Sequence, residues 1–138
     1  DEENNLWWSN RLKDHGANVI YGLQNLKVHS KLLQIKRISE GKTQYLTYIG
    51  TGNFNEGSAR FYTDYHLLTS NPTICADLEK VFEFLYEPFK VVKYKELLVS
   101  PHYSRAGIIK CLDREIAHAK KGIKSEVIMK FNFKFFFC

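Results

Sequence analysis

The chain has 138 residues, which is enough for one ordinary domain or for a piece of something larger. Its hydrophobic fraction of 44% excludes a disordered chain, and no apolar run has the length of a membrane span or a secretory signal. The 20 lysines and arginines outnumber the 15 aspartates and glutamates, and the net charge of +5 favours anionic partners such as nucleic acid, acidic lipid or polymeric phosphate.

The N-terminal part is expected to hold one helix and one short strand. Asn4 and Asn5 can cap a helix over residues 6–15, which Gly16 would end. Residues 17–22 have an apolar centre and predict a short buried strand.

A β-hairpin is predicted next. Residues 27–37 form a long strand candidate, residues 39–42 supply the turn, and residues 44–49 return as the partner strand. A glycine-rich loop over residues 50–55 follows. Residues 61–69 are rich in the aromatic and branched side chains that are typical of a further strand.

Two further helices are predicted from their start signals and apolar stripes. Asn71-Pro72 combines a capping residue with a proline suited to the first turn, and Pro88 ends the pattern. Ser100-Pro101 repeats the start signal for a second helix that continues up to Gly122. The apolar stripes consist of Ile74, Leu78, Val81, Phe82 and Leu85 in the first helix and of Ile108, Leu112 and Ile116 in the second.

The elements together indicate a mixed fold. Residues 123–131 predict a final strand, and an extended stretch over residues 89–98 separates the last two helices, so we expect a domain boundary near Glu96. Hairpin-like strands are interspersed with covering helices, which predicts an α/β class, with α+β as the alternative.

His29 and Lys31 are the first candidates for chemistry. Side chains two residues apart on a strand point to the same face, at a separation of roughly 6–7 Å, so these two are expected to project together. A neutral imidazole offers a free nitrogen for attack on phosphorus at neutral pH. The ammonium of Lys31 can offset the negative charge on the phosphoryl oxygens.

The loop Gly50-Thr51-Gly52-Asn53 is the second candidate. Its glycines allow backbone N–H groups to approach an anion closely, because no Cβ intervenes, and Thr51 and Asn53 add side-chain donors. Together with the His-x-Lys pair, this loop resembles the motif of the phospholipase D superfamily, in which His, Lys and a downstream Gly/Ser/Asn element surround a phosphate.

A narrower resemblance covers nearly the whole chain, which is similar to the polyphosphate kinase family. Its main segments are Leu26-Lys27-Val28-His29-Ser30-Lys31-Leu32-Leu33, Tyr48-Ile49-Gly50-Thr51-Gly52-Asn53-Phe54-Asn55-Glu56 and Ala59-Arg60-Phe61-Tyr62-Thr63-Asp64-Tyr65. Shorter segments are residues 1–5, 81–85, 98–101 and 113–116.

The resemblance implies a reversible kinase that moves the terminal phosphoryl group of ATP to the end of a polyphosphate chain, with Mg²⁺ as the cofactor. It implies that His29 forms a phosphohistidine intermediate and that Tyr62 contacts the nucleotide. We assign four further residues to phosphate binding on physical grounds: Lys31, Thr51, Asn53 and Arg60.

The resemblance also implies a phospholipase D-like mixed sheet flanked by helices. Residues 1–96 would be a catalytic domain that is incomplete at its N-terminus, and residues 97–138 the truncated start of a second such domain. Family members are several times longer, so an arginine ahead of this chain, and a histidine and an arginine of the last domain, would be missing. We therefore expect the isolated chain to be nearly inactive, because phosphoryl transfer needs all these groups assembled together.

The family implies a homo-oligomer when full length and peripheral association with membranes, and no nucleic-acid partner is expected. The three cysteines, Cys75, Cys111 and Cys138, have neither a paired nor a zinc-type spacing, which indicates free thiols and a cytoplasmic location. The phenylalanine-rich tail over residues 133–138 does not continue the family pattern.

Some polar residues are given structural roles. His15, His66, His102 and His118 have no metal-ligand spacing. Asp64 can contact magnesium through water, although one carboxylate is little evidence for a site.

Two alternative functions stay open. The first is a phosphodiesterase of the phospholipase D type, which commonly has an Asp several residues after the Lys; residues 32–37 contain none. The second is a non-catalytic module that binds polyanions through its basic surface and aromatic side chains.

Overall fold

The computed structural model describes residues 2–130. It contains α1 (Glu2–Asp14), β1 (Lys31–Ser39), β2 (Lys42–Gly50), α2 (Glu56–Ala59), β3 (His66–Thr69), α3 (Pro72–Tyr86) and α4 (Ser104–Lys120). The chain divides into two compact units, the first ending at Leu97 and the second beginning at Leu98. The predicted α/β class is confirmed.

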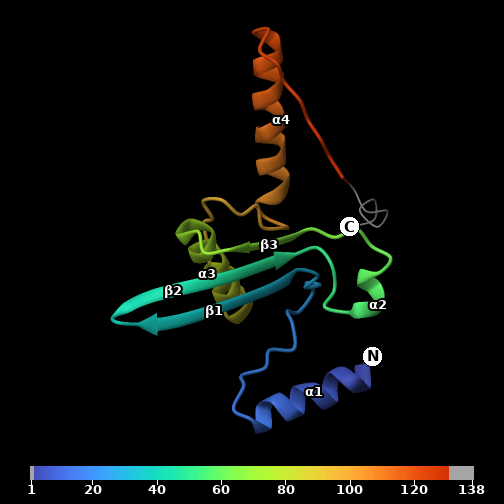
Figure 1. Cartoon of the computed structure of the whole chain (residues 1–138), viewed down its shortest axis with the longest axis vertical. Coiled ribbons are helices and arrows are strands. Elements are labelled where there is room, and N and C mark those ends of the chain that lie inside the picture. Colours follow the sequence, from blue (N-terminus) through green and yellow to red (C-terminus); the bar gives the residue numbers. More distant parts are fainter. Residues whose placement is uncertain (1, 131–138) are drawn as a thin grey trace. The chain divides into compact units, whose positions relative to one another are not determined.

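The first unit is built around a three-stranded sheet in the order β1-β2-β3, and both strand pairs are antiparallel (Figure 1). The predicted hairpin is confirmed: Ser39 lies opposite Lys42, and the two residues between them turn the chain. Glu40 and Gly41 have φ values of 52° and 72°. Two positive φ values in a two-residue turn are what the twist of a tight hairpin requires, and a glycine adopts such a value without strain.

Helix α3 begins where the sequence predicts. The Asn71 side chain accepts hydrogen bonds from the backbone N–H groups of Thr73 (2.9 Å) and Ile74 (3.2 Å), and Pro72 occupies the first turn. The helix ends at Tyr86, two residues before Pro88. The predicted start and end are therefore both confirmed.

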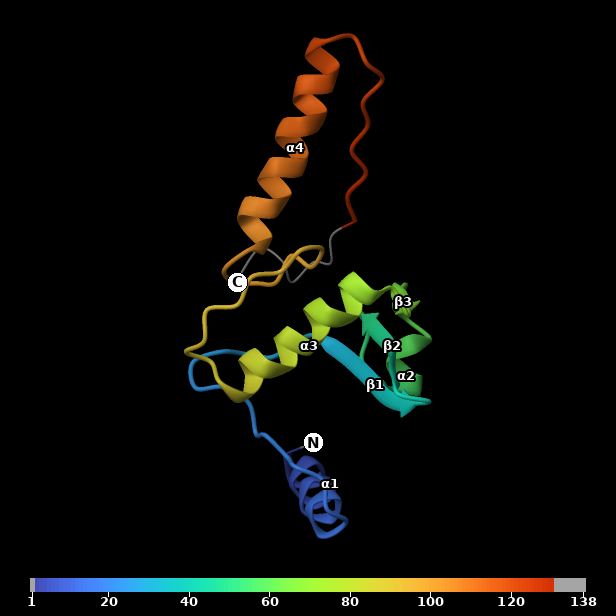
Figure 2. The same cartoon turned by 90° about the vertical axis from the view of Figure 1, so that its left-hand side faces the viewer.

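One face of the sheet is covered by α3, and the small core of the first unit lies between them (Figure 2). Cys75, Leu78 and Val81 of α3 are buried, as is Thr47 of β2. The Gln34 amide of β1 donates to the Thr47 hydroxyl (3.1 Å) and to the backbone carbonyl of Cys75 (2.8 Å), which ties both long strands to the helix. The opposite face exposes apolar side chains: Leu33, Ile35, Leu46 and Leu68.

An ion pair one helical turn further along α3 supports the same packing. Glu79 of α3 accepts hydrogen bonds from Lys36 of β1 (2.8 Å) and from the Tyr45 hydroxyl of β2 (3.0 Å). The hydrogen bond from Lys36 lowers the pKa of Glu79, and the same bond raises the pKa of Lys36. The charged forms of both groups therefore favour the packed arrangement.

Three strand predictions in the first unit need correction. Residues 17–22 form no strand, and Ile20 and Tyr21 are exposed; no strand among residues 2–130 runs alongside them to complete a ladder. The strand predicted over residues 27–37 begins only at Lys31, because its partner β2 ends opposite it at Gly50. The strand predicted over residues 61–69 is confined to β3, its last four residues.

The second unit contains α4, which starts at Ser104 rather than directly after Ser100-Pro101. The residue that follows the helix cap, Gly122, has φ 71° and ends the helix as predicted. Residues 123–130 are not a strand, contrary to the prediction, and position 131 of the predicted strand lies outside the described residues. Among the helices that the structure describes, none combines the length and the apolar character that crossing a bilayer requires.

Candidate functional site

His29, Lys31 and the start of the glycine-rich loop lie at the end of the sheet where β1 and β3 begin and β2 ends; Figure 1 shows this end of the strands. Lys31 lies opposite Gly50, and Gly50 lies opposite His66. Directly opposed residues of antiparallel strands share a face, so the side chains of Lys31 and His66 start on the same face with a glycine between them. Gln34 and Thr47 contact α3, and each lies three residues along its strand from Lys31 or Gly50, so they point to the other face. The row of Lys31, Gly50 and His66 therefore lies on the face that α3 leaves open.

His29 precedes β1 by two residues and is exposed to solvent. The prediction that His29 and Lys31 project together from one strand is therefore wrong in its geometry, because only Lys31 belongs to the strand. The two residues are nevertheless in contact. The Lys31 ammonium donates a hydrogen bond of 2.5 Å to the backbone carbonyl of His29, which holds a positive charge beside the backbone of the candidate nucleophile.

The glycine-rich loop is fastened to the segment that enters β3. The Thr51 backbone N–H donates to the Tyr65 carbonyl (3.1 Å), and the Thr51 hydroxyl accepts from the Tyr65 N–H (3.0 Å). The same hydroxyl donates to the Asp64 carboxylate (2.9 Å). Thr51, which the sequence suggests as a phosphate donor, therefore has a structural partner for its hydroxyl proton.

Side chains explain why positions 50 and 52 are glycines. A Cβ added at Gly50 would overlap the Tyr48 hydroxyl, and one added at Gly52 would overlap the Asp64 carboxylate. The sequence suggests that these glycines admit an anion. In the structure, the space beside Gly50 is occupied by Tyr48 of the same strand, and the space beside Gly52 is occupied by Asp64 of the segment that enters β3.

A tyrosine–histidine pair lies beside the loop. The Tyr48 hydroxyl and Nδ1 of His66 are 2.6 Å apart, and the two rings stack with centroids 5.7 Å apart and planes 28° apart. Phe54 of the loop also contacts Tyr48, with ring centroids 5.0 Å apart. Sequence reasoning treats His66 as structural, because its position opposite Gly50 becomes evident only when the β2–β3 register is known.

The other candidate residues lie on the loop and in the segment around α2. The Arg60 guanidinium forms an ion pair with Glu56 one helical turn earlier (2.5 Å), and both side chains are exposed. Asn55 caps α2 by accepting from the Ser58 N–H (2.9 Å). Asn53 and Tyr62 are both exposed to solvent.

The described residues offer little for a resident metal. No group of three or more His, Cys, Asp or Glu side chains that could hold an ion occurs within residues 2–130. Asp64 is a carboxylate at the candidate site, and Thr51 binds one of its oxygens. An Mg²⁺ ion that is bound to phosphate groups needs only one or two protein carboxylates, because the phosphates and water supply the other ligands, and Asp64 is one such carboxylate.

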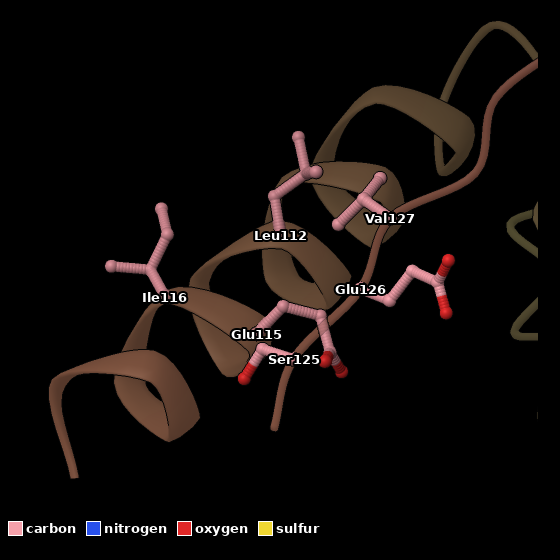
Figure 3. Close-up of a pocket in the computed structure, with 6 residues that line it drawn as sticks. All are labelled: Leu112, Glu115, Ile116, Ser125, Glu126 and Val127. Carbon is pink, nitrogen blue, oxygen red and sulfur yellow. The ribbon is translucent and has the colours of Figure 1, made fainter. Parts of the chain in front are cut away.

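A shallow groove of about 220 Å³ in the second unit is a different kind of site. Figure 3 shows Leu112, Glu115 and Ile116 of α4 on one side and the following segment on the other, and the complete lining is Leu112, Glu115, Ile116, Ser125, Glu126 and Val127. Apolar side chains together with two carboxylates disfavour a polyanion. The basic end of the sheet is therefore the better candidate for phosphate.

The family model described as "Polyphosphate kinase C-terminal domain 1" matches residues 1–91. The chain is 46% identical over 132 residues to a polyphosphate kinase of Vibrio cholerae, 44% to one of Vibrio vulnificus and 43% to one of Escherichia coli K12. Each match covers 96% of this chain and 19% of the relative, so the chain spans about a fifth of the length of these curated relatives.

A solved structure agrees with these matches. The crystal structure of polyphosphate kinase from Porphyromonas gingivalis superimposes with a TM-score of 0.70 at 35% sequence identity, covering 88% of this chain and 20% of that one. The chain belongs to the polyphosphate kinase family.

Proposed function

We propose that this chain is the part of a polyphosphate kinase that carries the histidine phosphorylated by ATP, and that this histidine is His29. The family membership supports the reaction class. The observation that carries the choice of residue is geometric. His29 is exposed on the segment that enters β1, next to the Lys31 ammonium, at the end of the sheet where the glycine-rich loop leaves β2.

The proposed reaction has two reversible steps. A ring nitrogen of His29 forms a bond to the γ-phosphorus of ATP while the bond from that phosphorus to the bridging oxygen breaks, and ADP leaves with the bridging oxygen. A terminal oxygen of polyphosphate then attacks the same phosphorus, the nitrogen–phosphorus bond breaks, and the chain is one phosphate longer. Lys31 offsets the charge on the equatorial oxygens in both steps.

The remaining substrate contacts are part of the same proposal. Tyr62, which is exposed, contacts the nucleotide, and the loop residues Thr51 and Asn53 bind phosphate. Arg60 joins them by exchanging its ion pair with Glu56 for a phosphate, which costs little because exposed ion pairs are weak. Mg²⁺ enters bound to ATP, near Asp64. The full-length protein is proposed to be a cytoplasmic homo-oligomer that associates peripherally with membranes.

Labelling of the full-length protein tests the proposal. Incubation with ATP labelled at the γ position should give a phosphoprotein that is labile to acid and stable to base, and His29→Ala should abolish the label. His118→Ala in α4 is the matched control and should be labelled like the wild type. Persistence of the label in His29→Ala would refute the assignment.

Two further measurements on the full-length protein separate the alternatives. A phosphodiesterase of the phospholipase D type would release an alcohol from a phosphodiester, whereas salt-sensitive polyphosphate binding without any labelling would indicate a non-catalytic module. The isolated 138-residue chain should show almost no polyphosphate-dependent ATP consumption. Sustained turnover by this chain alone would contradict that expectation.

A further inference from the structure

We infer that His66 is a further phosphate-binding residue of this site, held in place by Tyr48, and that it binds the polyphosphate chain next to the reacting phosphoryl group. This inference rests on the proposed function and extends it to a residue that the sequence motif does not contain. It starts from the row Lys31, Gly50 and His66, which lies across the three strands on the open face of the sheet.

The distance between Lys31 and His66 across the row suits an extended anion. Neighbouring strands lie about 4.8 Å apart, so the backbones at Lys31 and His66 are separated by roughly 10 Å. The residue between them is a glycine without a side chain of its own, and the Tyr48 hydroxyl lies in the space beside it. A nitrogen donor on each side of this hydroxyl suits a chain of phosphoryl groups better than a single phosphate.

The hydrogen bond between Tyr48 and His66 orients the histidine. If the hydroxyl donates to Nδ1 of His66, the neutral ring carries its proton on Nε2; if the ring is protonated, both nitrogens carry protons. In both of these forms Nε2 is a donor; in the third form Nδ1–H donates to the hydroxyl and Nε2 is an acceptor, so a phosphate oxygen selects the first two. The 2.6 Å contact together with the ring stacking restricts how the imidazole can turn. His66 is exposed, so Nε2 can reach a ligand from solvent.

The glycine at position 50 is part of the same arrangement. The Tyr48 hydroxyl reaches His66 across the space beside Gly50, and any Cβ there would overlap it. The Asp64 carboxylate is the charge that opposes anion binding nearby, and the Thr51 hydroxyl donates to it. The positive edge formed by Lys31, with His66 across the row, is therefore the side from which a polyanion can approach.

Binding of inorganic tripolyphosphate to the 138-residue chain tests the inference without any phosphoryl transfer. The imidazole signals of His66 should shift saturably in an NMR titration in magnesium-free buffer, whereas those of His15 in α1 and His118 in α4 should stay in place. His66→Ala should weaken binding about 3- to 10-fold, as expected for the loss of one exposed hydrogen bond to a charged group. His118→Ala is the matched control and should bind as the wild type does.

Tyr48→Phe keeps the ring and removes only the hydroxyl, so it should weaken binding by a smaller factor and reduce the shift at His66. Unchanged His66 signals at saturating tripolyphosphate, or equal affinity of His66→Ala and the wild type, would overturn the inference. A larger response to ADP than to tripolyphosphate would also overturn it, by assigning His66 to the nucleotide. Failure to label His29 would refute the proposed function and would not alter this binding result.

Discussion

Asp77 of α3 offers the sharpest test of how the first unit is held together. Its carboxylate is only 1% exposed. One oxygen accepts backbone N–H groups of Lys95 (2.7 Å), Glu96 (2.7 Å) and Leu97 (3.2 Å), and the other pairs with Lys80 at 3.2 Å. One side chain thus ties the last residues of the unit to the helix, and we predict that Asp77→Asn loosens this attachment.

The magnitude follows from the number of hydrogen bonds and from what water can replace. Hydrogen bonds to a charged group contribute about 1.5–3 kcal/mol each, but an asparagine oxygen can still accept some of the three, and the exposed residues Lys95 and Glu96 can bind water instead. We therefore expect Asp77→Asn to lower the free energy of unfolding by about 2 kcal/mol, which is well below the sum of three separate bonds.

The same contacts determine the dependence on pH. Burial favours the neutral acid, but the backbone N–H groups of Glu96, Leu97 and Lys95 together with Lys80 outweigh it, so the pKa of Asp77 lies below its ordinary value. A pKa that is lower in the folded state stabilises the fold above the pKa of the unfolded chain, about 3.9, and this contribution is lost as the pH falls below that value.

Urea unfolding of the chain at pH 7 measures the loss directly, and amide hydrogen exchange locates it. The amides of residues 95–97 should exchange faster in Asp77→Asn than in the wild type. When the pH is lowered from 5 into the acid range, the free energy of unfolding should fall less for the variant than for the wild type. Glu83→Gln is the matched control, because Glu83 lies on the same helix with only an exposed contact to Lys90 at 3.4 Å. Equal unfolding free energies of Asp77→Asn and Glu83→Gln, with unchanged exchange at residues 95–97, would refute the reasoning.

Two further substitutions test the core and the loop. Leu78→Ala should lower the free energy of unfolding in urea by about 2–4 kcal/mol, because Leu78 is 0% exposed. Ile38→Ala should lower it by well under 1 kcal/mol, because Ile38 is 73% exposed. Similar losses for the two variants would show that α3 does not form the core. Gly50→Ala should lower the free energy of unfolding by about 1–3 kcal/mol and displace the Tyr48 side chain, which the NMR signals of His66 would report. A variant with wild-type stability and unchanged His66 signals would contradict the close approach of the Tyr48 hydroxyl to Gly50.

Local signals determined those parts of the fold that depend only on neighbouring residues. The hairpin follows from Glu40-Gly41, since this pair can adopt two positive φ values. The start of α3 follows from Asn71-Pro72, because capping and a fixed proline φ act within one turn. The family resemblance likewise rests on local motifs, chiefly the His-x-Lys pair and the glycine-rich loop.

Pairing between distant segments decided the rest. His29 lies outside β1 because β2 ends opposite Lys31, and a strand extends only as far as its partner does. The second histidine at the site, His66, could be recognised only from the β2–β3 register, which brings it beside Tyr48 of the neighbouring strand. Sequence alone predicted Lys31 as a candidate for phosphate chemistry, whereas the strand register determined that Lys31 and His66 share one face, because a shift of one residue would turn each side chain to the other side.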